Sequence, residues 1–308
     1  MAWTTSDLLT EVRRVGQFPT STSASLADAD LLAQADRAMQ ASLVPMLLRV
    51  QEEFFVRRVT QALTAGVGMY PIPRRSIGSR VRDVRYSAAG VLSPVPRLRP
   101  EQVSDFLTQA TGRPYGFYLD AANICLLPAP NTADSLLIAI YVRPGRLTTS
   151  TTASRQLTNV QVDTPTTGRT KLTWATIYST YASGSIDVIS ALPPFEHKAL
   201  DIAAANITTT TLDVATSDLI ATPSIGDWVT LSDTSPVMQV PVEAHPLLVQ
   251  RTAQYVMRGL GYLEEAAALK SEADQMEQDV ISVLTPRSDG SPRRVTGGLL
   301  RLINRRGW

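Results

Sequence analysis

The strongest constraint on the fold is an apolar stripe that runs through residues 25–63. Its members recur every three or four residues, which places them on one face of a helix: Leu32, Ala35, Met39, Leu43, Met46, Val50 and Phe54. Ser25 is positioned to cap this helix, and Asp28 places a negative charge in its first turn, where the helix dipole favours one. Pro45 has no backbone N–H, so we expect it to kink the helix or to split it in two.

A second long helical pattern occupies residues 246–284. Gly259 and Gly261 predict a tight connection within it, and therefore a helical hairpin. The predicted buried side of its second helix consists of Leu269, Ala273, Met276, Val280 and Leu284. A shorter helix over residues 5–15, capped by Thr4 or Thr5 and ended by Gly16, precedes the first stripe. Because a long apolar stripe requires a helical partner, we predict one discontinuous bundle formed by residues 1–66 and 243–285.

The pattern between these helical ends has period two, which is typical of strands. In residues 67–145 it predicts a small antiparallel region with a hairpin turn at 120–123, one helix at 100–109, and strands at 67–72, 80–86, 115–119, 124–127 and 136–142. Residues 146–242 are rich in Thr and Ser and predict a sandwich or barrel, with helical spacing only around 195–205 and strands at 160–162, 171–174, 186–189, 207–214, 228–231 and 237–240. The predicted class is α+β, with this β region inserted into the bundle.

The last segment, residues 286–308, has a different composition. Gly, Pro and Ser interrupt its first half, and a few apolar residues flanked by arginines follow. Such a segment buries too little apolar surface to offset its own ordering entropy. We therefore expect an extended basic tail that becomes ordered only against a partner; the alternative is a solubilising tail.

Charge is segregated along the chain, although the net charge is only +1. Residues 57–99 contain nine arginines and one acid, Asp83, whereas residues 181–243 contain eight acids and one base, Lys198. This pattern favours contacts with oppositely charged surfaces or with DNA. As candidates for such contacts we single out Arg57, Arg58, Arg74, Arg75, Arg80 and Arg82. The open alternative is that these segments neutralise each other within one chain.

The residues that usually carry chemistry are scarce. The chain has one cysteine and two histidines, too few for a zinc site of the usual ligand types, and it contains no GxSxG elbow, P-loop or GxGxxG motif. We expect no catalytic, cofactor-binding or metal-binding residues, with Cys125 a buried thiol and His245 a helix-start residue. No apolar run is long enough to cross a bilayer, and no secretory signal is visible. A single cysteine excludes an intramolecular disulfide and fits folding in a reducing compartment.

Several stretches, in the same order along the chain, resemble the head-to-tail adaptor (connector) proteins of tailed bacteriophages. They are TTSDLLTEVRRVGQFP, DADLLAQADRAMQASLVPMLLRVQEEFFV, YPIPRRSIGSRVRDV, YGFYLDAANICLLPAP, LLIAIYVRPGRL and the segment from MQVPVEAHPLL to TPRSDGSPRRV. None of these stretches is a catalytic motif, so the resemblance implies a structural role.

The resemblance implies a ring, usually a dodecamer, that sits below the portal protein at the head–tail junction of the virion. The protein would be made in the host cytoplasm, and its ring would extend the DNA channel without sequence-specific DNA binding and dock the tail or nozzle protein. In such a ring, we expect the six arginines singled out above to contact a neighbouring subunit. We expect the C-terminal tail to bind the portal through Arg293, Arg294, Leu299, Leu300, Arg301, Ile303, Arg305, Arg306 and Trp308. The alternatives are another neck or tail structural protein, such as a nozzle or tail completion protein, and a carbohydrate hydrolase built on two carboxylates in a cleft.

Overall fold

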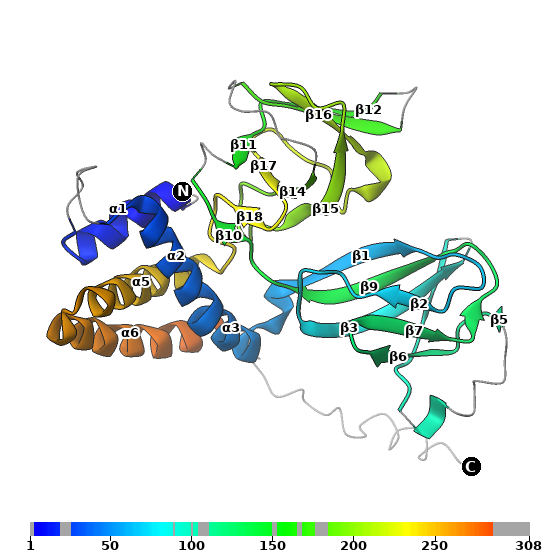
Figure 1. Cartoon of the computed structure of the whole chain (residues 1–308), viewed down its shortest axis with the longest axis horizontal. Helices are drawn as coiled ribbons and strands as arrows, with labels where there is room; N and C mark the ends of the chain where they lie inside the picture. The colour runs from blue at the N-terminus through cyan, green and yellow to red at the C-terminus, as the bar shows by residue number, and fades with distance from the viewer. Residues whose placement is uncertain are drawn as a thin grey trace, which may run out of the picture.

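A computed structural model describes residues 3–18, 26–88, 90–99, 101–103, 111–149, 153–164, 168–175 and 184–285. The fold is α+β, with helices and several antiparallel sheets (Figure 1). The helices gather at one end of the molecule, a small two-layered β structure lies at the other end, and a second β structure lies above both in the view of Figure 1. We call these parts the helical part, the small sandwich and the β insertion.

The helical part combines elements from both ends of the chain around one hydrophobic core. Its helices are α1 (Thr5–Val15), α2 (Asp28–Ala38), α3 (Val44–Val50), α5 (His245–Leu260) and α6 (Leu263–Leu284). All seven residues of the apolar stripe lie in this core or pack against it. Helix α5 is its central element, buried on nearly every side over its first three turns, and it contacts α1, α2 and α6.

The ends of these helices follow their local sequence. Thr4 caps α1 in a reciprocal capping box with Asp7, and Gly16 follows its last residue, as predicted. Gly261 ends α5 in the left-handed conformation, so the predicted helical hairpin is present. Ser25 lies outside the described residues, and the residue at the start of α2 is Ala27, which makes no side-chain cap. On α6, Ala273 and Val280 are buried, but Met276 is 36% exposed, contrary to prediction, because α6 packs only one narrow face on its neighbours.

The first long helical stretch is interrupted near Pro45, as predicted, but it departs from prediction after Val50. A π-helical turn, η1 (Met39–Leu43), precedes Pro45, whose nitrogen has no hydrogen to donate to the helix. A 3-10 turn, η2 (Glu52–Phe55), and strand β1 (Val56–Ala62) then replace the expected continuation to residue 63. Pairing of β1 with β9 outweighs the helical spacing of its own sequence.

The small sandwich packs two sheets on each other. One sheet has the order β1-β9-β3-β4 and the other β2-β7-β6. Their strands are β2 (Met69–Pro71), β3 (Ser76–Ala88), β4 (Val91–Pro94), β6 (Gly116–Asp120), β7 (Asn123–Leu127) and β9 (Ser135–Val142). Inward residues of both sheets form the core, among them Tyr70, Ile124 and Ile138. Every strand predicted in residues 67–145 is present, and so is the hairpin turn between β6 and β7. Of the predicted helix at 100–109, residues 101–103 are helical and 104–109 lie outside the described residues.

A short parallel pair, β5 (Thr111–Gly112) with β8 (Ala129–Pro130), borders the small sandwich.

The β insertion is one seven-stranded antiparallel sheet with the order β11-β17-β14-β15-β16-β13-β12. Its strands are β11 (Ser154–Gln156), β12 (Asn159–Thr164), β13 (Arg169–Thr173), β14 (Ser185–Ile189), β15 (His197–Ala205), β16 (Thr211–Ala215) and β17 (Trp228–Leu231), with a 3-10 turn, η3 (Thr216–Asp218), after β16. The sheet encloses its own core around Leu172, Val188 and Val229.

Two predictions for this region were wrong. Residues 197–205, whose spacing suggested a helix, form β15, because β14 and β16 pair with its two edges. Residues 237–240 form no strand; Val237 makes one isolated bridge to Thr4, and the segment leads through η4 (Val242–Ala244) into α5 with Val237, Met238 and Val240 fully buried. A short parallel pair, β10 (Arg146–Leu147) with β18 (Thr234–Ser235), carries the chain out to the β insertion and back.

Candidate functional site

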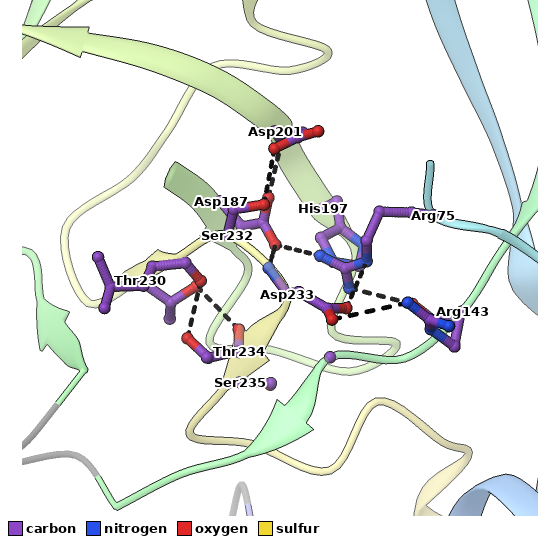
Figure 2. Close-up of polar contacts among 12 residues, drawn as sticks. Arg75, Arg143, Asp187, His197, Asp201, Thr230, Ser232, Asp233, Thr234 and Ser235 are labelled. Atoms are coloured by element: carbon purple, nitrogen blue, oxygen red, sulfur yellow. Dashed lines mark hydrogen bonds and ion pairs between the residues drawn. The ribbon is translucent and has the colours of Figure 1, made fainter. Parts of the chain in front are cut away.

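The most strongly coupled group of side chains lies where the small sandwich meets the β insertion. Arg75, between β2 and β3, has a side chain only 4% exposed, and it forms an ion pair with Asp187 of β14, whose side chain is fully buried. The Arg75 Nε also lies 3.2 Å from Asp233, and its Nη2 donates to the carbonyl of Arg143 at 3.0 Å (Figure 2). We call Arg75, Arg143, Asp187 and Asp233 the junction cluster.

Asp187 is held from both sides. Its second oxygen accepts the backbone N–H of Asp201 at 2.7 Å, and the oxygen facing Arg75 also accepts the N–H of Asp233 at 3.2 Å (Figure 2). Burial raises the pKa of Asp187, while the Arg75 charge and these N–H groups oppose that rise. The junction cluster therefore ties strands of the β insertion to the small sandwich through hydrogen-bonded charges.

A second set of polar contacts joins the helical part to the same place. Asp36 of α2 accepts the N–H of Leu147 in β10 at 2.8 Å, and Gln40 donates to the carbonyl of Pro144 at 3.2 Å. A cavity of about 340 Å³ separates these groups from Arg143, Arg146 and Asp233. Desolvation raises the pKa of Asp36 to about 6, against the effects of the Leu147 N–H and the Arg146 charge. All three parts of the molecule thus meet around the β10–β18 pair.

Both histidines are buried close to this meeting point. Gln239 accepts the N–H of Gly145 at 2.8 Å, so its amide nitrogen donates to His197 Nε2, which lies 3.0 Å away. Burial, with the nearby charges of Arg75 and Arg57, holds the pKa of His197 well below its ordinary value. His197 is therefore neutral, with its proton on Nδ1.

His245 begins α5, as predicted, and Nε2 donates to the carbonyl of Val240 at 3.2 Å. Its ring lies between Trp3, at 5.6 Å between ring centroids, and Phe195, at 5.9 Å. Burial lowers the pKa of His245. This histidine therefore packs the helical part against a residue of the β insertion.

The chemistry of these groups is that of a structural joint. Asp187 and Asp233 are the two carboxylates brought together here, and both are paired with Arg75, which leaves neither placed as a general acid. Cys125 is buried, as predicted, and burial raises its thiol pKa, which disfavours the thiolate. Within the described ranges, no three His, Cys, Asp or Glu side chains gather where a metal ion could bind.

The six arginines predicted at subunit contacts divide into two groups. Arg75 is buried in the junction cluster, and Arg57, with a side chain 12% exposed, donates to the carbonyls of Phe54 and Val56 and lies 3.9 Å from Glu196. Asp187 and Asp233 neutralise Arg75 within the chain, away from the surface. The other four are exposed: Arg58, Arg74, Arg80 and Arg82. The predicted portal-binding residues of the tail all lie outside the described residues.

The site residues that the sequence did not single out include Asp36, Arg143, Asp187 and Asp233. Asp36 carried a usable signal, since it lies four residues after Leu32 and three before Met39, beside the buried stripe. The signal for Asp187 was weaker, because it is only a single acid among apolar strand residues. Nothing in the sequence indicated that Arg75 is its partner.

The model of the SU10 adaptor protein family matches residues 3–176, more than half of the chain. The chain belongs to the SU10 adaptor protein family. The match covers α1 to α3, the small sandwich and the first strands of the β insertion, and it ends before α5 and α6. No curated protein matches the chain.

Family membership confirms the resemblance to phage head–tail adaptors and gives the chain a structural role among the proteins of a virion. In the described part of the chain, no helix has both the length and the apolar character needed to span a membrane.

Proposed function

We propose that this SU10 adaptor forms a ring beneath the portal at the head–tail junction, extends the DNA channel, and docks the tail or nozzle. The observation that carries the proposal is the family match over residues 3–176, combined with a fold that leaves different parts free for different partners. The β insertion is joined to the helical part through β10 and β18, and its far strands, β12 and β16, lie away from the helices (Figure 1). It is suited to meet one neighbour while the helices meet another.

The C-terminal tail is the segment proposed to bind the portal. Helix α6 ends at Leu284, and the residues that follow carry six arginines and one acid up to Trp308. We propose that Arg293, Arg294, Arg301, Arg305 and Arg306 pair with acidic groups of a portal subunit, and that Leu299, Leu300, Ile303 and Trp308 fill apolar grooves. Arginine and aromatic side chains often dominate such interfaces.

The exposed arginines are proposed to contact a neighbouring subunit of the ring rather than DNA. A lumen lined with arginines would bind phosphates strongly and hinder passage of the duplex. Arg74 is the clearest case, because it is exposed and no side chain in the described part of the chain pairs with it. Arg58, Arg80 and Arg82 are further candidates.

Truncation tests the portal contact. We expect the chain lacking residues 286–308 to stay folded, because the cut lies beyond the end of α6 at Leu284, and to fail to co-sediment with purified portal rings. The control replaces the five arginines named above with Gln and retains the apolar residues, which separates charge from anchoring. Unchanged co-sedimentation of the truncated chain would contradict the portal contact.

A nozzle or tail completion protein is the second candidate, and the same experiment distinguishes it. Such a protein would bind a preformed adaptor ring rather than a bare portal ring. Electron microscopy of the full-length chain mixed with portal alone decides between the two. Added density on the portal supports the adaptor, and its absence supports the nozzle or tail completion protein.

A further inference from the structure

A groove separates the small sandwich from the β insertion. Its volume is about 790 Å³, and apolar side chains from both parts line it, with polar residues interspersed; they include Leu137, Leu200, Ile202, Leu219 and Ile220. Arg58, Asp201 and Asp218 are the charged residues of its lining. An apolar groove of this size, open between two packed β structures, can hold an extended chain segment.

The groove continues into a charged hollow at the start of β1. The hollow has a volume of about 630 Å³, and it shares Arg58 and Ile220 with the apolar groove. Four arginines line the hollow, and three of them have acidic partners: Arg82 with Glu53, Arg85 with Asp83, and Arg57 with Glu196. Arg58 is exposed, and no acid in the described part of the chain pairs with it. This end of the groove therefore has one unpaired positive charge.

The wall on the sandwich side is the edge strand β1. Among the strands of the described residues it pairs only with β9, so its other edge has no strand partner there. Leu63, one residue past the strand, lies opposite Asp134 and donates its backbone N–H to the Asp134 carbonyl. In an antiparallel ladder, every second residue bonds to the neighbouring strand in this way, so Leu63 and the odd-numbered residues of β1 face β9. The backbone groups of Arg58, Thr60 and Ala62 therefore point away from β9.

At each end of this free edge, a backbone carbonyl already accepts a hydrogen bond from a side chain. The side chain of Arg57 donates to the Val56 carbonyl at 2.7 Å, and the side chain of Gln61 donates to the Ala62 carbonyl at 3.0 Å. Among the described residues, no hydrogen bond from outside the sheet reaches the backbone of Arg58 or Thr60. The middle of β1 thus offers donors and acceptors directly beside the apolar groove.

We propose that β1 takes up an extended segment of a partner protein as an added strand, with apolar side chains in the groove and an acidic end at Arg58. Strand addition explains the open backbone groups, the apolar wall and the unpaired charge together. DNA would satisfy only the charge, since phosphates use neither an apolar wall nor a strand edge. The inference does not depend on ring formation.

The probe is a labelled synthetic peptide about as long as β1, which has seven residues, with alternating Thr and Val and a terminal pair of Glu. Binding to the full-length chain is followed by fluorescence anisotropy. We expect the Glu peptide to bind about tenfold more tightly than the same peptide with Lys in place of Glu. The variant Arg58→Glu should reverse this preference, and Arg97→Glu, at an exposed arginine that lines neither the groove nor the hollow, should leave it unchanged.

Two further measurements test the strand itself. A peptide with alternate backbone nitrogens methylated, which cannot complete the ladder, should lose binding to the unaltered protein. Thr60→Pro should also abolish binding, because the lost N–H faces the free edge and not β9. Equal binding of the Glu, Lys and methylated peptides would overturn the proposal. The proposal would also be overturned if duplex DNA competed as strongly as the unlabelled peptide. Self-association of the chain that is lost in Thr60→Pro would likewise overturn it, because β1 would then pair with a second copy.

Discussion

Arg75 shows how a single side chain decides between two interpretations of the charge pattern. It belongs to the arginine-rich segment, and its partners Asp187 and Asp233 belong to the acidic one. Segregation along the sequence therefore becomes neutralisation in space at this position, whereas Arg74, the preceding residue, is exposed. Only the folded positions distinguish the two arginines, since their sequence contexts are nearly the same.

Removing one partner of the buried pair should be costly. Asp187→Ala leaves Arg75 without its buried partner, so we expect the free energy of unfolding in urea to fall by about 3–5 kcal/mol. Asp83→Ala, which breaks the surface pair with Arg85, is the matched control and should cost less than about 1 kcal/mol. The double variant Arg75→Met with Asp187→Leu should recover much of the loss. Equal effects of the two single variants would show that the junction cluster contributes no more than a surface pair.

Asp36 should make stability depend on pH. Its folded pKa of about 6 lies above its ordinary value of 3.8, so the folded state binds the proton more tightly. Stability from this group is greatest below pH about 4 and is lost as the pH rises through about 6. The full shift corresponds to about 3 kcal/mol, which solvent screening at this partly exposed carboxylate reduces to about 2 kcal/mol. Asp36→Asn keeps an acceptor for the Leu147 N–H and removes the titration.

We therefore expect the difference in unfolding free energy between Asp36→Asn and the unaltered chain to grow from pH 4 to pH 7, in favour of the variant. The two buried histidines have lowered pKa values, so their contribution to the unfolding free energy decreases as the pH falls below 6.5. This contribution is the same in both proteins and cancels in the difference. Asp30→Asn, which changes an exposed carboxylate of the same helix, is the control. A constant difference across this range would contradict a raised pKa.

At the scale of elements, local sequence signals predicted the helices well and the strand partners poorly. The capping residues of α1 and the glycine that ends α5 act within a few residues, so their effect can be read from the chain. Strand β1 was missed because its spacing continues the helical stripe, while the residues that make it a strand are in β9, far along the sequence. The same reason explains β15, which two other strands hold from either side.

The connection between α5 and α6 offers two glycines with opposite expected effects. Gly261 has a φ of +88°, which side chains other than glycine adopt at a cost, so Gly261→Ala should destabilise the chain by about 1 kcal/mol. Gly259 is helical and a Cβ there would meet nothing within 4 Å, so Gly259→Ala should stabilise by about 0.5–1 kcal/mol. Thermal unfolding of both variants measures the signs, and two shifts in the same direction would contradict this geometry.

At the scale of the whole molecule, the exposed arginines should matter for assembly and not for folding. The variant Arg74→Glu should leave the melting temperature nearly unchanged, since this side chain is exposed and pairs with no side chain in the described part of the protein. We expect it to weaken ring formation on the portal about tenfold at low salt, and less at about 0.5 M salt, where exposed charges are screened. Arg97→Glu, at another exposed arginine, is the control. An equal loss from Arg97→Glu would indicate a general effect of charge rather than a specific contact.

The shared core of the helical part has a consequence for synthesis. Helices α1 and α2 leave the ribosome early, yet the apolar surface that covers them belongs to α5, which is translated after both β structures. Contacts this distant along the chain form slowly, and unburied stripes aggregate. During translation, the apolar faces of α1 and α2 therefore remain without their native cover until α5 has been made.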